Sequence, residues 1–152
     1  MGHDDGLTLS ICLRCRDGRE DQDTDLDMRG GRRLARAVAA VFAASAAAER
    51  GVVLRGVNCM SQCKRPCTIA LSGHSRFTYL FGDLDPKVHT DDVLAVATAY
   101  ADATDGFLPR SARPEVLRAG ILGRVPPLEH AGDLVEPLQA HTPQPNMEKD
   151  TP

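Results

Sequence analysis

The stretch Leu7-Thr-Leu-Ser-Ile-Cys-Leu-Arg14 decides the fold, because apolar and polar or small residues alternate along it without a break. Strict alternation of this kind predicts a strand with one buried face. Downstream, residues 31–48 repeat their apolar side chains with helical spacing, which predicts an amphipathic helix. Residues 52–57 are rich in β-branched side chains and predict a second strand. A strand, a helix and a strand in this order predict two parallel strands joined by a crossover.

Farther along the chain, residues 68–72 and 76–81 predict two more strands, and the short polar link between them predicts a hairpin. Thr90 is positioned to cap a following helix, and Pro114 to start a short last one. The order β-α-β-β-β-α predicts an α/β fold with a four-stranded mixed sheet and a short helical C-terminal extension.

The 152 residues suggest one domain with additions at its C-terminal end. We expect the domain over residues 6–106 and an extension that packs on it over residues 107–130. From residue 131 the sequence becomes polar and rich in proline, which predicts a disordered tail over residues 131–152.

The net charge of −3 argues against a general nucleic-acid binder. No apolar run reaches the roughly 18 residues that a membrane span needs. The first residues are polar and acidic, unlike a secretory signal, so we expect a cytoplasmic protein.

Five cysteines form the most informative pattern. Cys12 and Cys15 are separated by two residues, and Cys59, Cys63 and Cys67 follow one another with three residues between each pair. Clustered thiols in a reducing compartment indicate metal or redox chemistry more often than structural disulfides. Because neighbouring parallel strands end at the same edge of a sheet, we expect all five thiols to gather there.

Three chemistries compete for these thiols: a 2Fe–2S cluster, a zinc ion held by thiolates, and dithiol exchange at Cys12 and Cys15. The acidic residues 17–27 disfavour the third, because carboxylates oppose thiolate formation. Four cationic residues flank the cysteines: Arg14, Arg16, Lys64 and Arg65. Their charge would offset that of an anionic cluster. Such residues are equally typical of an ordinary solvated surface. We expect no catalytic residues, and an electron carrier or metal-binding protein rather than an enzyme.

Residues 7–100 resemble the thioredoxin-like 2Fe–2S ferredoxins. The resemblance is carried by Cys59-x3-Cys63, Pro66, the strand after it, and the acidic helix start at Asp91-Asp92. It implies a thioredoxin-like fold whose C-x3-C pair holds one side of the cluster, with two earlier cysteines on the other. Cys12 matches the first of these. The second has no counterpart at the family's spacing, so Cys15 or Cys67 takes its place, or the metal differs.

More closely, the chain resembles a bacterial family of predicted metal-binding proteins of unknown function. The segments Tyr79-x-Phe81-Gly82-Asp83-Leu84 and Asp105-Gly106-Phe107 carry this likeness. The resemblances imply a redox partner protein, a homodimer and a link to cobalt or cobalamin metabolism. The alternative function is a non-redox module that binds or delivers zinc or cobalt.

Overall fold

A mixed five-stranded sheet forms the centre of the protein, in a computed structural model that describes residues 5–19 and 24–139. The sheet has the order β2-β1-β3-β4-β5. Its strands are β1 (Thr8–Cys12), β2 (Val53–Val57), β3 (Ile69–Ser72), β4 (Thr78–Phe81) and β5 (Ile121–Val125). β1 and β2 are parallel and the other pairs are antiparallel, which confirms the predicted mixed sheet.

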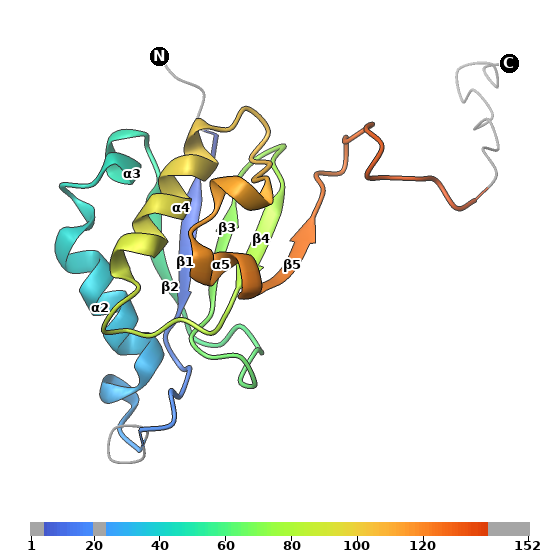
Figure 1. The fold of residues 1–152 in the computed structure, drawn as a ribbon. Coiled ribbons are helices and arrows are strands. Elements are labelled where there is room, and N and C mark those ends of the chain that lie inside the picture. The colour runs from blue at the N-terminus through green and yellow to red at the C-terminus, as the bar shows by residue number, and fades with distance from the viewer. Residues whose placement is uncertain (1–4, 20–23, 140–152) are drawn as a thin grey trace, which may run out of the picture.

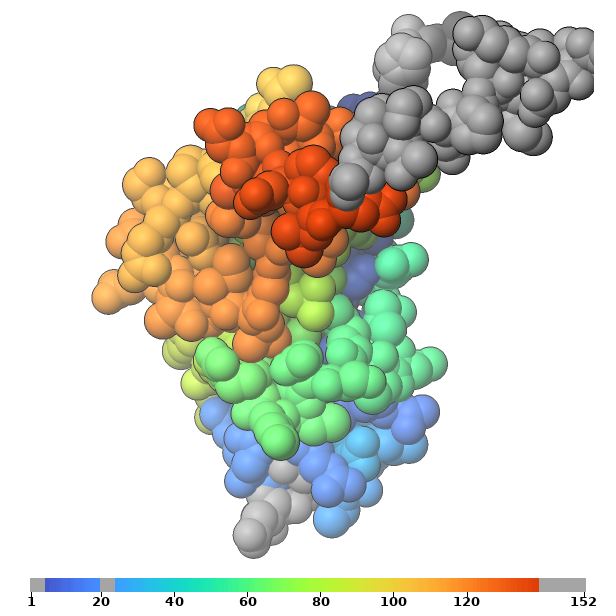
Figure 2. Space-filling model, turned by 90° about the vertical axis from the view of Figure 1, so that its right-hand side faces the viewer, coloured from blue at the N-terminus to red at the C-terminus, as the bar shows by residue number. Residues whose placement is uncertain are grey.

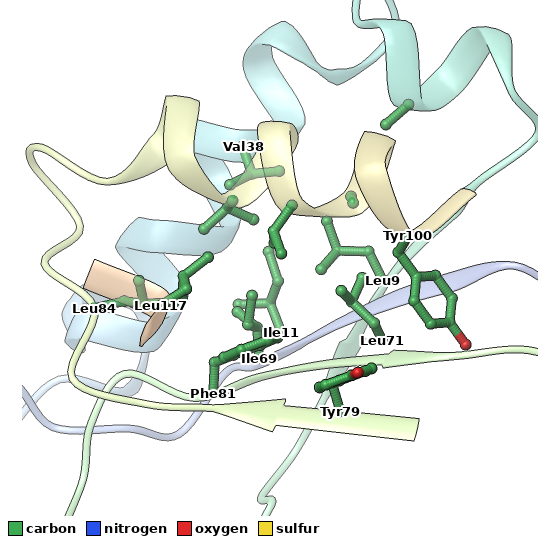
Figure 3. Packing of buried hydrophobic residues seen from close by; sticks show 14 of the residues in the cluster. Leu9, Ile11, Val38, Ile69, Leu71, Tyr79, Phe81, Leu84, Tyr100 and Leu117 are labelled. Atoms are coloured by element: carbon green, nitrogen blue, oxygen red, sulfur yellow. The ribbon is translucent and has the colours of Figure 1, made fainter. Parts of the chain in front are cut away.

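The helices cover one face of this sheet (Figure 1). They are α2 (Gly30–Phe42), α3 (Ala46–Glu49), α4 (Thr90–Asp102) and α5 (Glu115–Ala119), with short 3-10 turns η1 (Leu26–Met28) and η2 (Arg110–Ala112). Between the layers, aliphatic and aromatic side chains from both meet in a continuous core (Figure 3). Leu9 and Ile11 on β1 are fully buried in it, as the alternating pattern predicted.

The predicted helix over residues 31–48 is wrong in one respect, because the chain breaks into α2 and α3 at Ser45. The Ser45 hydroxyl donates to the carbonyl oxygen of Phe42 over 2.6 Å. It also accepts from the N–H of Ala48 over 3.2 Å, and so caps α3. Serine favours such local bonds at helix starts over a place inside a helix.

Two further expectations need correction. The sheet has a fifth strand, β5, which pairs antiparallel with β4 from Thr78 opposite Val125. The start of α4 is also shifted by one residue: His89 occupies the capping position without a side-chain capping bond to the helix, and Thr90 is the first helical residue.

Residues 131–139 form neither helix nor strand. Residues 140–152 lie outside the described part of the chain, so the predicted disorder of residues 131–152 stays a prediction there. Within the described ranges, no helix combines the length and hydrophobicity that crossing a bilayer requires.

The Tyr79 hydroxyl ties the segment after α4 to the sheet. It accepts a hydrogen bond from the backbone N–H of Leu108 over 2.8 Å, and both residues are buried. Tyr79→Phe should therefore lower the free energy of unfolding by about 1–3 kcal/mol, because it leaves a buried N–H without a partner. Urea unfolding monitored by circular dichroism measures this loss.

Tyr100→Phe is the matched comparison. The Tyr100 hydroxyl donates to the carbonyl oxygen of Phe77 over 2.6 Å, so this change leaves only a carbonyl unpaired. Unpaired carbonyls are tolerated better than unpaired N–H groups, and we expect the smaller loss. Equal stability of Tyr79→Phe and the unmodified chain would contradict the role given to this bond.

Candidate metal-thiolate site

The end of β1 is fixed by both of its neighbours. The backbone N–H of Cys12 donates to the carbonyl oxygen of Thr68 over 3.0 Å, and that of Leu13 donates to Val57 over 2.8 Å. These bonds continue the pairing of β1 beyond its last residue on each side. The Cys12–Cys15 segment therefore starts from a rigid position at the carboxyl end of the strand.

The N-terminus of α2 closes over the same segment. The N–H of Gly31 donates to the carbonyl oxygen of Cys15 over 3.0 Å. A Cβ atom on Gly31 would overlap the carbonyl oxygen of Cys12, so only glycine permits this approach. This requirement for glycine depends on a contact between distant segments, which no local sequence pattern displays.

Cys12 and Cys15 form a coupled pair of buried thiols. A hydrogen bond from the Cys15 side chain lowers the pKa of Cys12 to about 5, although burial opposes this. The same hydrogen bond and burial raise the pKa of Cys15. Within this pair, Cys12 is therefore the thiol that ionises more readily.

Backbone N–H groups also surround the Cys12 sulfur. Those of Arg14, Met60 and Cys15 donate to it, and each stabilises the charged form. The bond from Met60 matters further, since it joins the first cysteine segment to the second.

Cys67 occupies a different environment. Its side chain is fully buried, and burial followed by the negative charge of Asp17 raises its pKa to about 12. A Cβ atom on Gly30 would lie 3.1 Å from its sulfur, so the helix start covers it closely. Backbone bonds in both directions fasten Cys67 to Leu84. It is a neutral, enclosed thiol.

Cys59 and Cys63 are exposed, in the loop between β2 and β3. The N–H of Ser61 donates to the Cys59 sulfur over 3.4 Å, which curls the loop around that atom. Cys59 and Ser61 both have positive φ values, 152° and 59°. The loop thus adopts a conformation that its non-glycine residues rarely take.

A pocket of about 370 Å³ opens beside these two thiols. We call it the rim pocket; it is lined by Arg14, Arg16, Arg29, Asn58, Cys59 and Cys63. No carboxylate from the described ranges lines it. The Arg29 guanidinium donates to the carbonyl oxygen of Arg14 over 3.4 Å. This bond connects the residue just before α2 to the first cysteine segment. The exposed thiols therefore face a positively charged surface.

Not all of the predicted flanking cations contribute to this surface. Arg14 and Arg16 line the rim pocket, and Lys64 is exposed outside it. The Arg65 guanidinium instead makes paired hydrogen bonds to the Asp83 carboxylate, with Nε 2.9 Å from each oxygen. The sequence did not single out Arg29, which comes from the far end of the acidic loop.

The two cysteine segments lie against each other, as the strand geometry predicted. In Figure 2 the green loop that carries the second segment lies directly over the blue segment that follows β1. Across residues 5–19 and 24–139, however, no three His, Cys, Asp or Glu side chains are grouped as a metal ion requires. The segments are brought together, while the ligand set of Cys12, Cys15, Cys59, Cys63 and Cys67 remains a prediction.

A match to a protein family covers most of the chain. Residues 9–127 match the family described as "Protein of unknown function (DUF1636)". The chain belongs to this family. The matched range begins in β1 and ends just after β5, so it takes in both cysteine segments and the whole sheet.

The DUF1636 chain is also similar to a solved structure. A thioredoxin-like [2Fe-2S] ferredoxin from Aquifex aeolicus superposes with a TM-score of 0.50 and 14% sequence identity. The superposition covers 82% of this chain and 97% of the ferredoxin. This likeness shows that the fold is thioredoxin-like. No curated protein matches the sequence.

Proposed function

We propose that this DUF1636 protein carries a 2Fe–2S cluster for electron transfer, held by Cys12, Cys15, Cys59 and Cys63. The observation that supports it best is the backbone hydrogen bond that Met60, inside the second cysteine segment, donates to the Cys12 sulfur. The Cys12 sulfur therefore lies at the junction of both segments, with its pKa lowered by the surrounding donors. The fold that it shares with a 2Fe–2S ferredoxin adds support.

The donor set fits such a group in its chemistry. Thiolates are the soft ligands that iron–sulfur clusters require, and a bound cluster would accept and donate single electrons. N–H groups directed at the Cys12 sulfur favour the thiolate form of that ligand. The N–H of Ser61 likewise donates to the Cys59 sulfur. Arg14, Arg16 and Arg29 supply positive charge against the negative charge of a four-thiolate site.

Cys67 is left out of the proposed set. Its sulfur is enclosed under the start of α2, beside Gly30, whereas the Cys15 side chain is hydrogen-bonded to Cys12 at the junction of the two cysteine segments. The earlier possibility that Cys67 replaces the second ligand is therefore the weaker one. Cys15, adjacent to the Cys12 sulfur, is the better candidate for that position.

Dithiol exchange is disfavoured by burial. The side chains of Cys12 and Cys15 are 3% and 2% exposed, so the sulfur of a substrate protein has no direct approach to either. Exchange needs an accessible attacking thiolate. This supports a metal-binding role over a thiol-disulfide enzyme.

Anaerobic purification followed by elemental analysis tests the proposal. We expect iron and acid-labile sulfide in equal amounts, with visible absorbance that bleaches on reduction, as a cluster held by thiolates requires. Stoichiometric zinc or cobalt without sulfide would contradict it and would instead support the non-redox metal-binding module.

A further inference from the structure

A groove of about 340 Å³ runs between α2 and β2, and no cysteine lines it. It exists because the facing side chains are small. Ala35 and Ala39 are the helix residues that border it, and Gly56 allows the Leu13 side chain to lie across the strand as part of its floor. Ile11 and Leu54 complete an aliphatic lining.

The strand beside this groove is an edge of the sheet. β2 stands first in the strand order and, within the described chain, pairs only with β1. The backbone N–H of Val53 donates to the carbonyl oxygen of Leu7, and that of Leu13 donates to the carbonyl oxygen of Val57. The backbone groups of residues 53 and 57 therefore point toward β1. In a parallel pair the intervening residues point the other way, which directs the backbone groups of Leu54 and Gly56 outward. They can pair with a further strand.

Positive charge lies along the helix side of the groove. Arg32 and Arg36 line it, no carboxylate does, and the buried Nε atom of Arg32 has no hydrogen-bond partner in the described structure. Arg55 is not part of this charge, because its Nε donates to the Ser10 hydroxyl on the other face of the sheet. Leu13 of the groove is followed by Arg14 of the rim pocket, so the two basic surfaces adjoin.

From these observations we infer that β2 and its groove bind an extended acidic segment of a partner protein as an added strand. The outward groups of Leu54 and Gly56 supply the ladder hydrogen bonds. Side chains on the helix-facing side of the added strand fill the groove, apolar ones against the aliphatic floor and carboxylates against Arg32 and Arg36. The inference goes beyond the proposed cluster and does not require it. It places the partner next to the rim pocket.

Other occupants fit the charge less well. If two copies of this chain paired through β2, Arg32 and Arg36 of one copy would face the same positive charges of the other, and the two sets would repel. A nucleic acid would meet a protein of net charge −3 and a groove lined by aliphatic rather than aromatic side chains. The chain's own C-terminal segment leaves from β5, at the opposite edge of the sheet (Figure 1).

The probe is a blocked, fluorescently labelled ten-residue peptide, titrated into the full-length protein as purified. Every second residue is serine, and valine and glutamate alternate at the positions between, so that both point to the same face of the strand. We expect binding that weakens as salt rises, with amide shifts at residues 53–57. Arg36→Glu should weaken binding by about tenfold or more, since it reverses a facing charge. Arg110→Glu makes the same charge change on exposed η2 and should leave binding unchanged. A central proline in the peptide should abolish binding, because it interrupts the ladder.

Three results would overturn the inference. They are equal binding of the valine–lysine counterpart, tighter binding of a ten-nucleotide oligothymidylate at the same salt, and a stable dimer whose β2 amides are protected without peptide. Each of these measurements reports on the peptide and on β2, so a result that overturns this inference does not bear on the metal content. Absence of a cluster likewise leaves the peptide titration interpretable.

Discussion

Cys12→Ser is expected to leave the purified protein with less than about one tenth of the iron and sulfide of the unmodified chain. Loss of an outer-shell partner alone weakens metal sites by about 10–100-fold, and loss of a ligand costs more. A serine hydroxyl does not ionise at neutral pH, so the N–H groups that surround the Cys12 sulfur would face a neutral oxygen. Elemental analysis and the visible spectrum measure the loss.

Cys67→Ser is the matched control, because it makes the same atomic change in the same fold. Cys67 is enclosed away from the rim pocket, so we expect metal content close to that of the unmodified protein. Stability should fall, since the hydroxyl is buried without an assigned partner. Full metal retention by Cys12→Ser, or its loss in Cys67→Ser alone, would show that the proposed ligand set is wrong.

Gly31→Ala is expected to destabilise the protein by about 1–3 kcal/mol or more, as overpacking does. An alanine inside a helix normally stabilises it by about 1 kcal/mol relative to glycine, so the sign is reversed here. The cause is the overlap of the new Cβ atom with the carbonyl oxygen of Cys12, which must push α2 away from the Cys12–Cys15 segment. We therefore expect reduced metal content together with the loss of stability, measured by urea unfolding and iron analysis.

Gly123→Ala provides the comparison. A Cβ atom on Gly123 would meet nothing within 4 Å, so this change in β5 should shift stability by less than about 1 kcal/mol and leave the metal content unchanged. Similar behaviour of the two variants would mean that the close approach of Gly31 is not required.

Most of the fold follows from local patterns. The alternation in residues 7–14 predicted β1 and the burial of Leu9 and Ile11 against the helices. The expected exposure of the other face is wrong, because Ser10 and Cys12 are buried as well in this interior strand of the sheet. The order of elements then predicted the parallel pair of β1 and β2 and the antiparallel β3–β4 hairpin. These features are set by periodicity and chain order, which a single sequence displays directly.

The missed elements depend on tertiary contacts. β5 contains Gly123 and Arg124, which interrupt its apolar pattern, and its strand conformation is supplied by pairing with β4. Its bounding Gly120 and Pro126-Pro127 were the available signal. At Ser45, the high helix propensity of the surrounding alanines hid a break that a single hydroxyl stabilises.

The site was predictable as a location but not in its internal arrangement. Spacing and strand order placed both cysteine segments at one end of the sheet, and they do meet there. Nothing local distinguishes Cys67 from Cys63, yet one is enclosed and the other exposed. That difference arises from Gly30 and Leu84, which pack over Cys67 from distant parts of the chain.

The position of β5 has a consequence for synthesis of the protein. Of the strands in the described ranges it is the last to leave the ribosome, yet it pairs with β4, which is completed before α4 and α5 are made. A nascent chain therefore presents the outer backbone groups of β4 to its surroundings while those helices are translated. Unpaired strands of this kind promote aggregation, so a chaperone that shields nascent chains should increase the yield of folded protein.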